Sequence, residues 1–394
     1  MKKSVSLLAI LALAACGGDG SPSGNGNVRS NYHNRTPIEA FPNEAKESND
    51  NITQVISRNN AQRADFVKYR LSINGYDNVT DETNFSSIGQ LAYDIAANAS
   101  DAEINSLLAL NNREPLRAAL YVIAPELAVC AEQNTTAALR TCVSELRASA
   151  NLGDKIDQVI RNTDTRLTVD KLEFTNTDGG DAQLTFAIDD SGKIIGITLD
   201  ETTYTRDKNV FKNGDKTLTY VSGMDALSPL MYSDFGKYTI TDATAGTTTS
   251  QYFFGGYDVK RIDPTAIQQV GAETNMAFRG RAVGMVENGT ASKELNGSAD
   301  LIFNTTNRSS QVKATFEDWY DVTVNTNNEI SFDNFQGDAA YKFATSGDGA
   351  AHSGATFDVN YYGHDDTHPT EAVGGAQYRE GDINFNMAFG VKKQ

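Results

Sequence analysis

The sequence predicts an α+β protein with several domains, in which a helical domain precedes two regions rich in β-strands. Apolar residues recur at helical spacing between about residues 51 and 163. From about residue 167 onward, apolar and polar residues alternate in short runs that end in turn residues. The chain of 394 residues is also too long for one average domain. We therefore expect a helical domain over residues 51–163 and strands from there to the end.

The first fifteen residues have the pattern of an export signal. Lys2 and Lys3 precede a short apolar stretch, which ends in Leu13-Ala14-Ala15-Cys16. This stretch is shorter than the roughly 20 apolar residues that a membrane-spanning helix needs. A leucine and two small residues before a cysteine resemble the lipobox, where bacterial lipoproteins are cleaved and acylated. We expect a signal peptide over residues 1–15, with lipid such as palmitate on Cys16 as the only attachment to the membrane.

Residues 16–50 are expected to form a flexible tether between the lipid and the folded body. Their first part is rich in glycine, serine and asparagine, a composition typical of flexible linkers. An ordinary secretory signal with a chance cysteine is the alternative, but the position of Cys16 and the tether behind it favour a lipoprotein. Gly17 stands where the usual inner-membrane retention signal has aspartate. The sequence thus favours the outer membrane without indicating which leaflet.

Cys130 and Cys142 are expected to form a disulfide. They remain as an even pair once Cys16 is set aside, in a chain predicted to be exported to an oxidising compartment. Both fall on apolar faces of neighbouring predicted helices, joined by a polar turn at Gln133-Asn134-Thr135. The alternative is two free thiols that lie close in the sequence. A bridge here would join two helices of one hairpin.

The negative charge of the chain limits the classes of partner that it is expected to bind. The formal net charge is −17, and removal of Lys2 and Lys3 with the signal would lower it to about −19. Such a chain is not expected to bind nucleic acid, because binding to phosphates needs clustered lysine and arginine. The acidity could attract basic partners, although keeping the protein soluble is the more common reason for it.

The C-terminal region is expected to form an antiparallel, up-and-down, soluble β-barrel of about eight strands over residues 271–394. Its strands have one apolar and one polar face, and closure into a barrel removes exposed edges. An outer-membrane pore would give a similar alternation, but the lipid anchor makes a second membrane attachment redundant. The residues that share apolar faces include Ala299, Leu301 and Phe303, then Val312, Ala314 and Phe316, and finally Phe385, Met387 and Phe389.

Several short motifs follow one another in this region. They are Gly297–Phe303, Ser353–Phe357 with Tyr361-Tyr362-Gly363, then Glu371–Gly375, and a chain end just after Phe389-Gly390. In this order and spacing, over about the last 120 residues, they resemble the barrel domain of transferrin-binding-protein-B-like surface lipoproteins. His364 departs from the pattern, because the family usually has proline there.

The resemblance implies a single lobe, in which residues 165–270 form a β-rich, handle-like domain beside the C-terminal barrel. It also implies a surface-exposed lipoprotein that binds a host macromolecule. Relatives of this single-lobe type bind complement regulators, capture haem or support host colonisation. Many are moved to the cell surface by an outer-membrane translocator that recognises the barrel, and we expect such a partner here.

Three residues are candidates for ligand contact. Trp319 is expected to point away from the barrel interior, because strand alternation places Phe316 and Tyr320 on the inner face. His364 and His368 lie with two aspartates in a predicted loop. That grouping could hold a metal, but a polar loop with chance histidines is the simpler interpretation. These histidines, or His352, could also ligate haem.

We expect neither a resident cofactor nor an enzyme. The sequence lacks a nucleophile elbow, a phosphate-binding loop and a zinc-protease helix. The leading hypothesis is a cell-surface lipoprotein that binds a host protein, in colonisation, nutrient capture or immune evasion. One alternative is capture of haem or another iron source. The other is a structural envelope lipoprotein that faces the periplasm.

Overall fold

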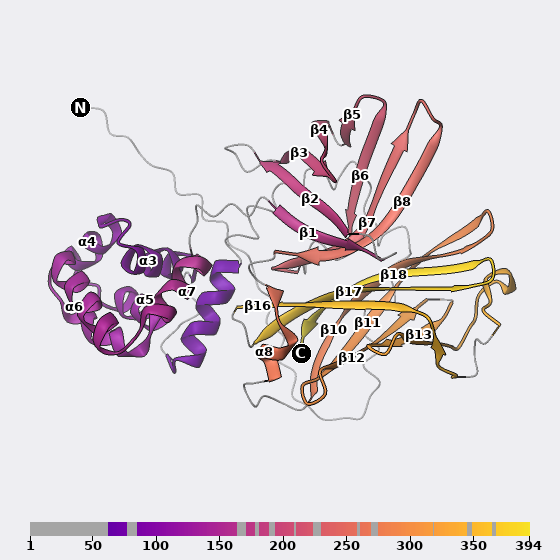
Figure 1. Ribbon diagram of the computed structural model, residues 1–394. Helices are drawn as coiled ribbons and strands as arrows, with labels where there is room; N and C mark the ends of the chain where they lie inside the picture. The colour runs from indigo at the N-terminus through magenta and orange to yellow at the C-terminus, as the bar shows by residue number, and fades with distance from the viewer. Residues whose placement is uncertain are drawn as a thin grey trace. The chain divides into compact units, whose positions relative to one another are not determined.

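A computed structural model describes residues 62–76, 85–163, 171–177, 181–188, 194–208, 210–223, 230–257, 261–268, 275–317, 319–344, 349–364 and 368–394 (Figure 1). The expected signal peptide, Cys16 and the tether lie outside these residues. The α+β prediction is confirmed, because helices come first and antiparallel strands follow. Across the described ranges, no helix combines the length and apolar character that crossing a bilayer would require.

The helical region packs around one apolar core. A helix over residues 62–73 is followed by α3 (Phe85–Ala97), α4 (Ala102–Ala109), α5 (Glu114–Ile123), the 3-10 helix η2 (Pro125–Glu132), α6 (Thr136–Ser149) and α7 (Gly153–Thr163). Pro115 lies in the first turn of α5, where its missing N–H is not needed. Pro125 ends the α-helical path, and the chain continues as η2, because proline cannot donate within a helix. Leu120, Leu127 and Leu139 are fully buried in the shared core.

The first group of strands forms a closed ring. It comprises β1 (Lys171–Asn176), β2 (Asp181–Ile188), β3 (Ile194–Leu199), β4 (Thr202–Asp207), β5 (Val210–Asn213), β6 (Lys216–Ser222), β7 (Ser233–Asp242) and β8 (Thr247–Gly256). Neighbours in the ring are neighbours in the chain, and β1 closes it by pairing with β8. The Asn213-Gly214 turn joins β5 to β6, with Gly214 at a φ of 56°. The region expected to be handle-like is therefore itself a small barrel, called here the first ring.

The second group of strands forms a ten-stranded antiparallel sheet. It comprises β9 (Arg261–Ile262), β10 (Asn275–Asn288), β11 (Ala291–Asn304), β12 (Ser309–Phe316), β13 (Asp321–Asn325), β14 (Glu329–Asp333), β15 (His352–Ser353), β16 (Thr356–Gly363), β17 (Pro369–Glu380) and β18 (Ile383–Lys393). The short helix α8 (Pro264–Gln268) lies between β9 and β10. The strand order is β15-β14-β13-β12-β11-β10-β18-β17-β16-β9.

The two ends of this sheet meet on one stretch of chain. β15 pairs with β14, whereas β16, which is separated from the end of β15 by two residues, pairs with β17. Residues 352–363 thus run between the two ends of the sheet, and β10 to β18 make eight up-and-down chain passes of a curled sheet. Its ends are joined through this stretch of chain and not by pairing of β14 with β16. This agrees with the expected barrel of about eight strands, and we call it the second ring. The edge strand β9 was not expected in it; it pairs with β16 at Tyr361 and Tyr362.

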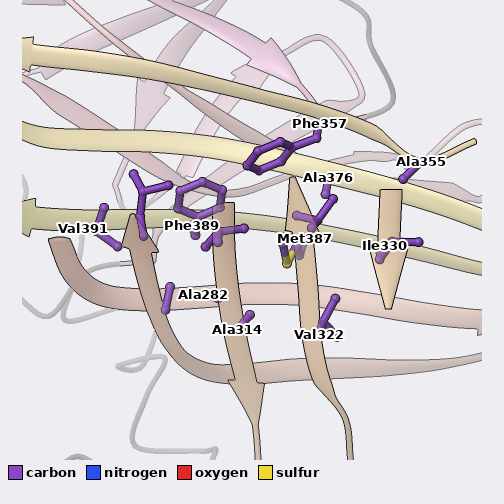
Figure 2. Close-up of a cluster of buried hydrophobic side chains, with 14 of the residues drawn as sticks. Ala282, Ala314, Val322, Ile330, Ala355, Phe357, Ala376, Met387, Phe389 and Val391 are labelled. Atoms are coloured by element: carbon purple, nitrogen blue, oxygen red, sulfur yellow. The ribbon is translucent and has the colours of Figure 1, made fainter. Parts of the chain in front are cut away.

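Apolar side chains fill the second ring. Ala282 of β10, Val322 of β13, and Met387 and Phe389 of β18 point into the same interior (Figure 2). Strand alternation explains this, since every second residue of each strand faces inward. The outward residues of β17 and β18 are therefore free to contact another part of the chain.

Candidate functional site: the junction of the two rings

The outer faces of β17 and β18 pack against β7 and β8, and this contact joins the two rings. One buried core contains residues of both, including Phe235 and Phe254 from the first ring and Val373 and Ala388 from the second. The motif residues of the second ring, from Tyr362 to Gly390, converge at this junction. The rings are thus coupled through buried apolar surface, which is the largest favourable contribution to such a contact.

Glu371 is buried at the centre of the junction, with 2% of its surface exposed. Its Oε2 accepts hydrogen bonds from the Tyr232 backbone N–H at 3.1 Å and the Ser233 hydroxyl at 2.7 Å. Its Oε1 accepts from the backbone N–H of Met231. One carboxylate of β17 therefore satisfies three donors at the start of β7, about 140 positions away in the chain.

Burial raises the pKa of the Glu371 carboxyl above its ordinary value, because water is excluded from the charged form. The donors from Met231, Ser233 and Tyr232, together with the charge of Lys392, lower this pKa but do not cancel the effect of burial. Because donors are fixed at both oxygens, the buried Glu371 carboxyl holds β17 and the start of β7 in one relative orientation, and we call this contact the clamp.

Glycines allow the backbones of the two rings to approach. A Cβ on Gly375 of β17 would lie 2.6 Å from the Thr177 side chain and 2.7 Å from the ring of Phe254. A Cβ on Gly390 of β18 would overlap the ring of Phe235. Both distances are too short for real carbon atoms, so any side chain here would push the rings apart. This is the physical reason for glycine at positions 375 and 390.

A polar border surrounds the apolar centre of the junction. The hydroxyl of Tyr252 donates to the carbonyl oxygen of Gly284 at 2.8 Å. The ammonium group of Lys237 pairs with the carboxylate of Glu294 on β11. Both contacts join β7 or β8 to the second ring, and they mark where the packed area ends.

His364 lies beside this junction and is buried, with 5% of its surface exposed. Its Nδ1 is 2.7 Å from the hydroxyl of Tyr232, and its Nε2 is 3.2 Å from the carboxylate of Asp65. Its ring stacks on Tyr69 at 4.8 Å between centroids. Both ring nitrogens therefore have partners within the chain. Burial, with the charges of Asp65 and Glu371, raises the pKa of the Tyr232 phenol well above its usual value.

His368 is near His364, but the two rings have different neighbours. Its Nδ1 is 3.3 Å from the hydroxyl of Tyr69. The two aspartates between the histidines lie outside the described residues, so the expected grouping is only partly visible. In the segments that are described, no cluster of three histidine, cysteine or acidic side chains has the arrangement needed to hold a metal ion.

Trp319 lies inside the second ring, with 1% of its surface exposed, so the prediction that it points outward is wrong. It stacks on Phe385 and contacts Phe316 and Tyr320 edge to face. The prediction failed because Trp319 and Tyr320 lie between the end of β12 and the start of β13 and belong to neither strand. Alternation between faces does not apply there, and both Trp319 and Tyr320 turn inward.

Cys130 and Cys142 are joined by a disulfide in the helical region. Cys130 comes from η2 and Cys142 from α6, so the bridge links the two elements on either side of the polar turn. Thr135 caps α6 by accepting a hydrogen bond from the Ala138 backbone N–H, which fixes where this helix begins.

Glu371 stands within one of the motifs, but the sequence alone assigned no role to it and did not point to Tyr232 or Ser233. The available signal was an acidic residue in a strand that is otherwise small and apolar. A charged residue in such a position needs a partner when it is buried. The partner itself could not be found from the sequence, because it lies on a strand of the other ring.

No family model matches the sequence, and no curated protein sequence matches it. Among solved structures, a variant of the vaccine antigen transferrin binding protein B from Haemophilus parasuis is similar, with 15% identity and a TM-score of 0.35, over 57% of this chain and 44% of that one. Intact Ap-TbpB, with its N and C lobes, has 13% identity and a TM-score of 0.36, over 57% and 45%. This chain spans less than half the length of those proteins.

Proposed function

We propose that this chain is an outer-membrane lipoprotein, anchored through Cys16 and exposed at the cell surface, whose β-rich lobe binds a host macromolecule. The observation that carries the proposal is the junction at Glu371. A buried carboxylate and closely packed glycines hold two rings in one fixed arrangement. Binding surfaces gain affinity when their parts are fixed before the partner arrives, because less ordering is needed on binding.

The filled interior of the second ring supports binding on the outside of the lobe. Phe303, Trp319 and Phe332 are buried among the apolar side chains inside it. A protein that carried a small ligand within this ring would need space there. Together with the resemblance of its motifs to surface lipoproteins, this favours contact with a macromolecule through outer faces and loops.

The lipobox and tether support attachment to the membrane by lipid alone. A chain with a glycine-rich linker after Cys16 can hold its folded part away from the bilayer. A translocator that recognises the second ring would bring the lobe to the outer leaflet, and this partner is part of the proposal. An enzymatic role is not proposed, since the junction residues serve as hydrogen-bonding and packing partners for one another.

Protease digestion of intact cells tests the proposal. Loss of the lobe on immunoblots, while periplasmic marker proteins survive, is the expected result. A Cys16→Ser variant should escape from the membrane fraction, because it lacks the acylated residue. Full protection of the lobe would overturn the surface location and favour the structural lipoprotein that faces the periplasm.

A haem titration distinguishes host-macromolecule binding from the alternative function of haem capture. His364 already has a partner at each ring nitrogen, which makes it a poor axial ligand. We therefore expect no Soret band shift when haem is added to the purified chain. A saturable shift at one haem per chain would replace host-macromolecule binding by haem capture.

A further inference from the structure

The outer face of β7 and β8 changes character where it leaves the junction. Phe235 and Phe254 are register partners and are buried against the second ring. Two residues further along each strand, Lys237 and Tyr252 are partners and form the polar border. Since every second residue of a strand shares one face, the next rows on this same face consist of hydroxyl side chains.

These rows extend over three strands. Thr219 of β6 lies opposite Thr239 of β7, which lies opposite Ser250 of β8. The next row has the same order of strands and only threonines. We call this set the hydroxyl block, and its members are Thr217, Thr219, Thr239, Thr241, Thr248 and Ser250.

The hydroxyl block is accessible and carries no charge. Thr241 and Thr248 are exposed, and the other members are half-buried. Two pairs of hydroxyl oxygens are close across the strands, 3.0 Å apart for Thr239 and Ser250 and 3.4 Å apart for Thr241 and Thr248. Each hydroxyl has one donor and two acceptor sites, so these pairs leave further capacity for a partner.

The second ring presents a matching set on its own outer face. The amide group of Gln377 on β17 donates to Asn384 Oδ1 on β18 at 3.3 Å. The Asn384 amide group donates in turn to the Glu287 carboxylate on β10 at 3.0 Å. We call these three residues the amide row. Along their strands they lie an even number of positions from Gly375, Gly390 and Met285. They therefore share with those residues the face that packs on the first ring.

Strand register places the hydroxyl block and the amide row next to the same polar border of the junction. The Tyr252 hydroxyl bonds to Gly284, and the strand neighbour of Gly284 is Met285, which lies opposite Asn386. One row beyond that border are Thr239 and Ser250 on one ring, and Asn384 with Glu287 on the other. Figure 1 shows β7 and β8 diverging from β18 beyond the junction, and Thr241 and Thr248 on this part of the first ring are exposed.

Two buried acceptors at this border have no donor. Among the residues that the structure describes, Asn386 Oδ1 and Asn296 Oδ1 are covered from solvent and make no hydrogen bond. They flank β10 from either side, opposite Met285 and Val283. Unpaired buried acceptors are uncommon in proteins, because each has lost its hydrogen bonds to water without replacing them. A small rearrangement that pairs them with donors of a ligand would be favourable.

We propose that the hydroxyl block and the amide row form a binding surface for a neutral glycan chain. Hydroxyls, carboxamides and one carboxylate can donate to and accept from the hydroxyl groups of a sugar without requiring charge on it. Rows of side chains repeat about every 4.8 Å across strands, which suits a chain of repeating polar units. A polyanionic glycan would be repelled by a body of net charge −17, so the neutral class fits better.

This glycan surface would specify the chemical class of the host partner, and its role in the cell rests on the proposed function. Affinity electrophoresis of the full chain, purified in detergent, tests it in native gels that contain dextran or mannan, with heparin as the anionic comparison. We expect at least one neutral polysaccharide to slow the chain, and heparin to have no effect. No retardation by dextran or mannan, or retardation by heparin alone, would overturn the proposal.

Matched variants locate the surface. Thr241→Val with Thr248→Val removes two hydroxyls at nearly constant shape, and valine favours strands, so the first ring should still fold. We expect the dissociation constant for the polysaccharide to rise about tenfold. Thr323→Val, on β13 of the second ring, is the control and should bind normally. Equal binding by the double variant and the control would contradict the assignment.

The two proposals can fail separately. Retardation in gels together with full protection from protease on cells would leave the glycan surface standing and remove the surface location. Exposure on cells without retardation would leave the host-macromolecule proposal standing and remove the glycan as its partner.

Discussion

Glu371 and Ser233 are 138 positions apart in the chain, yet the Ser233 hydroxyl donates to Glu371 Oε2 at 2.7 Å in a site closed to solvent. This hydrogen bond joins β17 of one ring to β7 of the other. The backbone N–H groups of Met231 and Tyr232 donate to the same carboxylate. Three donors at the start of β7 therefore bind one carboxylate, which makes Glu371 the residue whose loss should uncouple the rings.

Replacing Glu371 by glutamine should destabilise the chain by about 2 kcal/mol, because an amide nitrogen cannot accept from the donors that face it. Urea unfolding followed by tryptophan fluorescence measures this effect, since Trp319 is the single tryptophan of the chain and lies in the second ring. Glu145→Gln, on the exposed side of α6, is the control and should change the free energy of unfolding by less than about 0.5 kcal/mol. An equal, small effect of both changes would show that the clamp contributes nothing.

The same carboxyl should make stability depend on pH. Its pKa is raised by burial in the folded chain, so the folded state holds this proton to higher pH than the unfolded state does. The stabilisation that comes from the bound proton is therefore fully present below the ordinary carboxyl pKa and is lost as pH rises through the raised value. The free energy of unfolding of the wild type, minus that of Glu371→Gln, should fall across this window. Unfolding curves at several pH values measure the difference, and a profile that is flat or rises would contradict the raised pKa.

Substituting Gly375 by alanine should separate the rings. The new Cβ would meet Thr177 and Phe254 at distances shorter than van der Waals contact, at a cost of about 1–3 kcal/mol. Thermal unfolding of the variant should show a lower midpoint than the wild type. Gly153→Ala at the start of α7 is the control, because nothing lies within 4 Å of the added carbon. A Gly375→Ala variant as stable as this control would show that the rings can move apart freely.

Local features of the fold could be predicted from the sequence because neighbouring residues determine them. The break at Pro125 follows from the missing N–H of proline, and the β5–β6 turn follows from Asn213-Gly214. The eight chain passes of the second ring follow from strand alternation. Closure of the first ring could not be predicted, because it depends on β1 pairing with β8 across some 80 residues.

The candidate site was harder to predict than the fold. The motif around Glu371, Gly375 and Gly390 was visible as a pattern, but its role depends on Ser233 and Phe254 in a different ring. His364 was expected in an open loop and is instead buried against Tyr232. A single sequence contains the residues of such a contact without indicating which strands meet. Trp319 adds a second cause of error, since alternation was applied beyond the end of β12.

Loss of the Cys130–Cys142 bridge should weaken the helical region and leave the rings unchanged. The bridge closes a loop with a sequence separation of 12, for which restriction of the unfolded chain contributes about 3 kcal/mol. A Cys130→Ala and Cys142→Ala double variant should therefore lose helical circular dichroism at lower urea concentration than the wild type. The Trp319 fluorescence transition reports on the second ring and should keep its midpoint, because the two cores consist of different residues. If both transitions moved together by the same amount, the helical region and the rings would unfold as one unit, and the bridge would stabilise all of it.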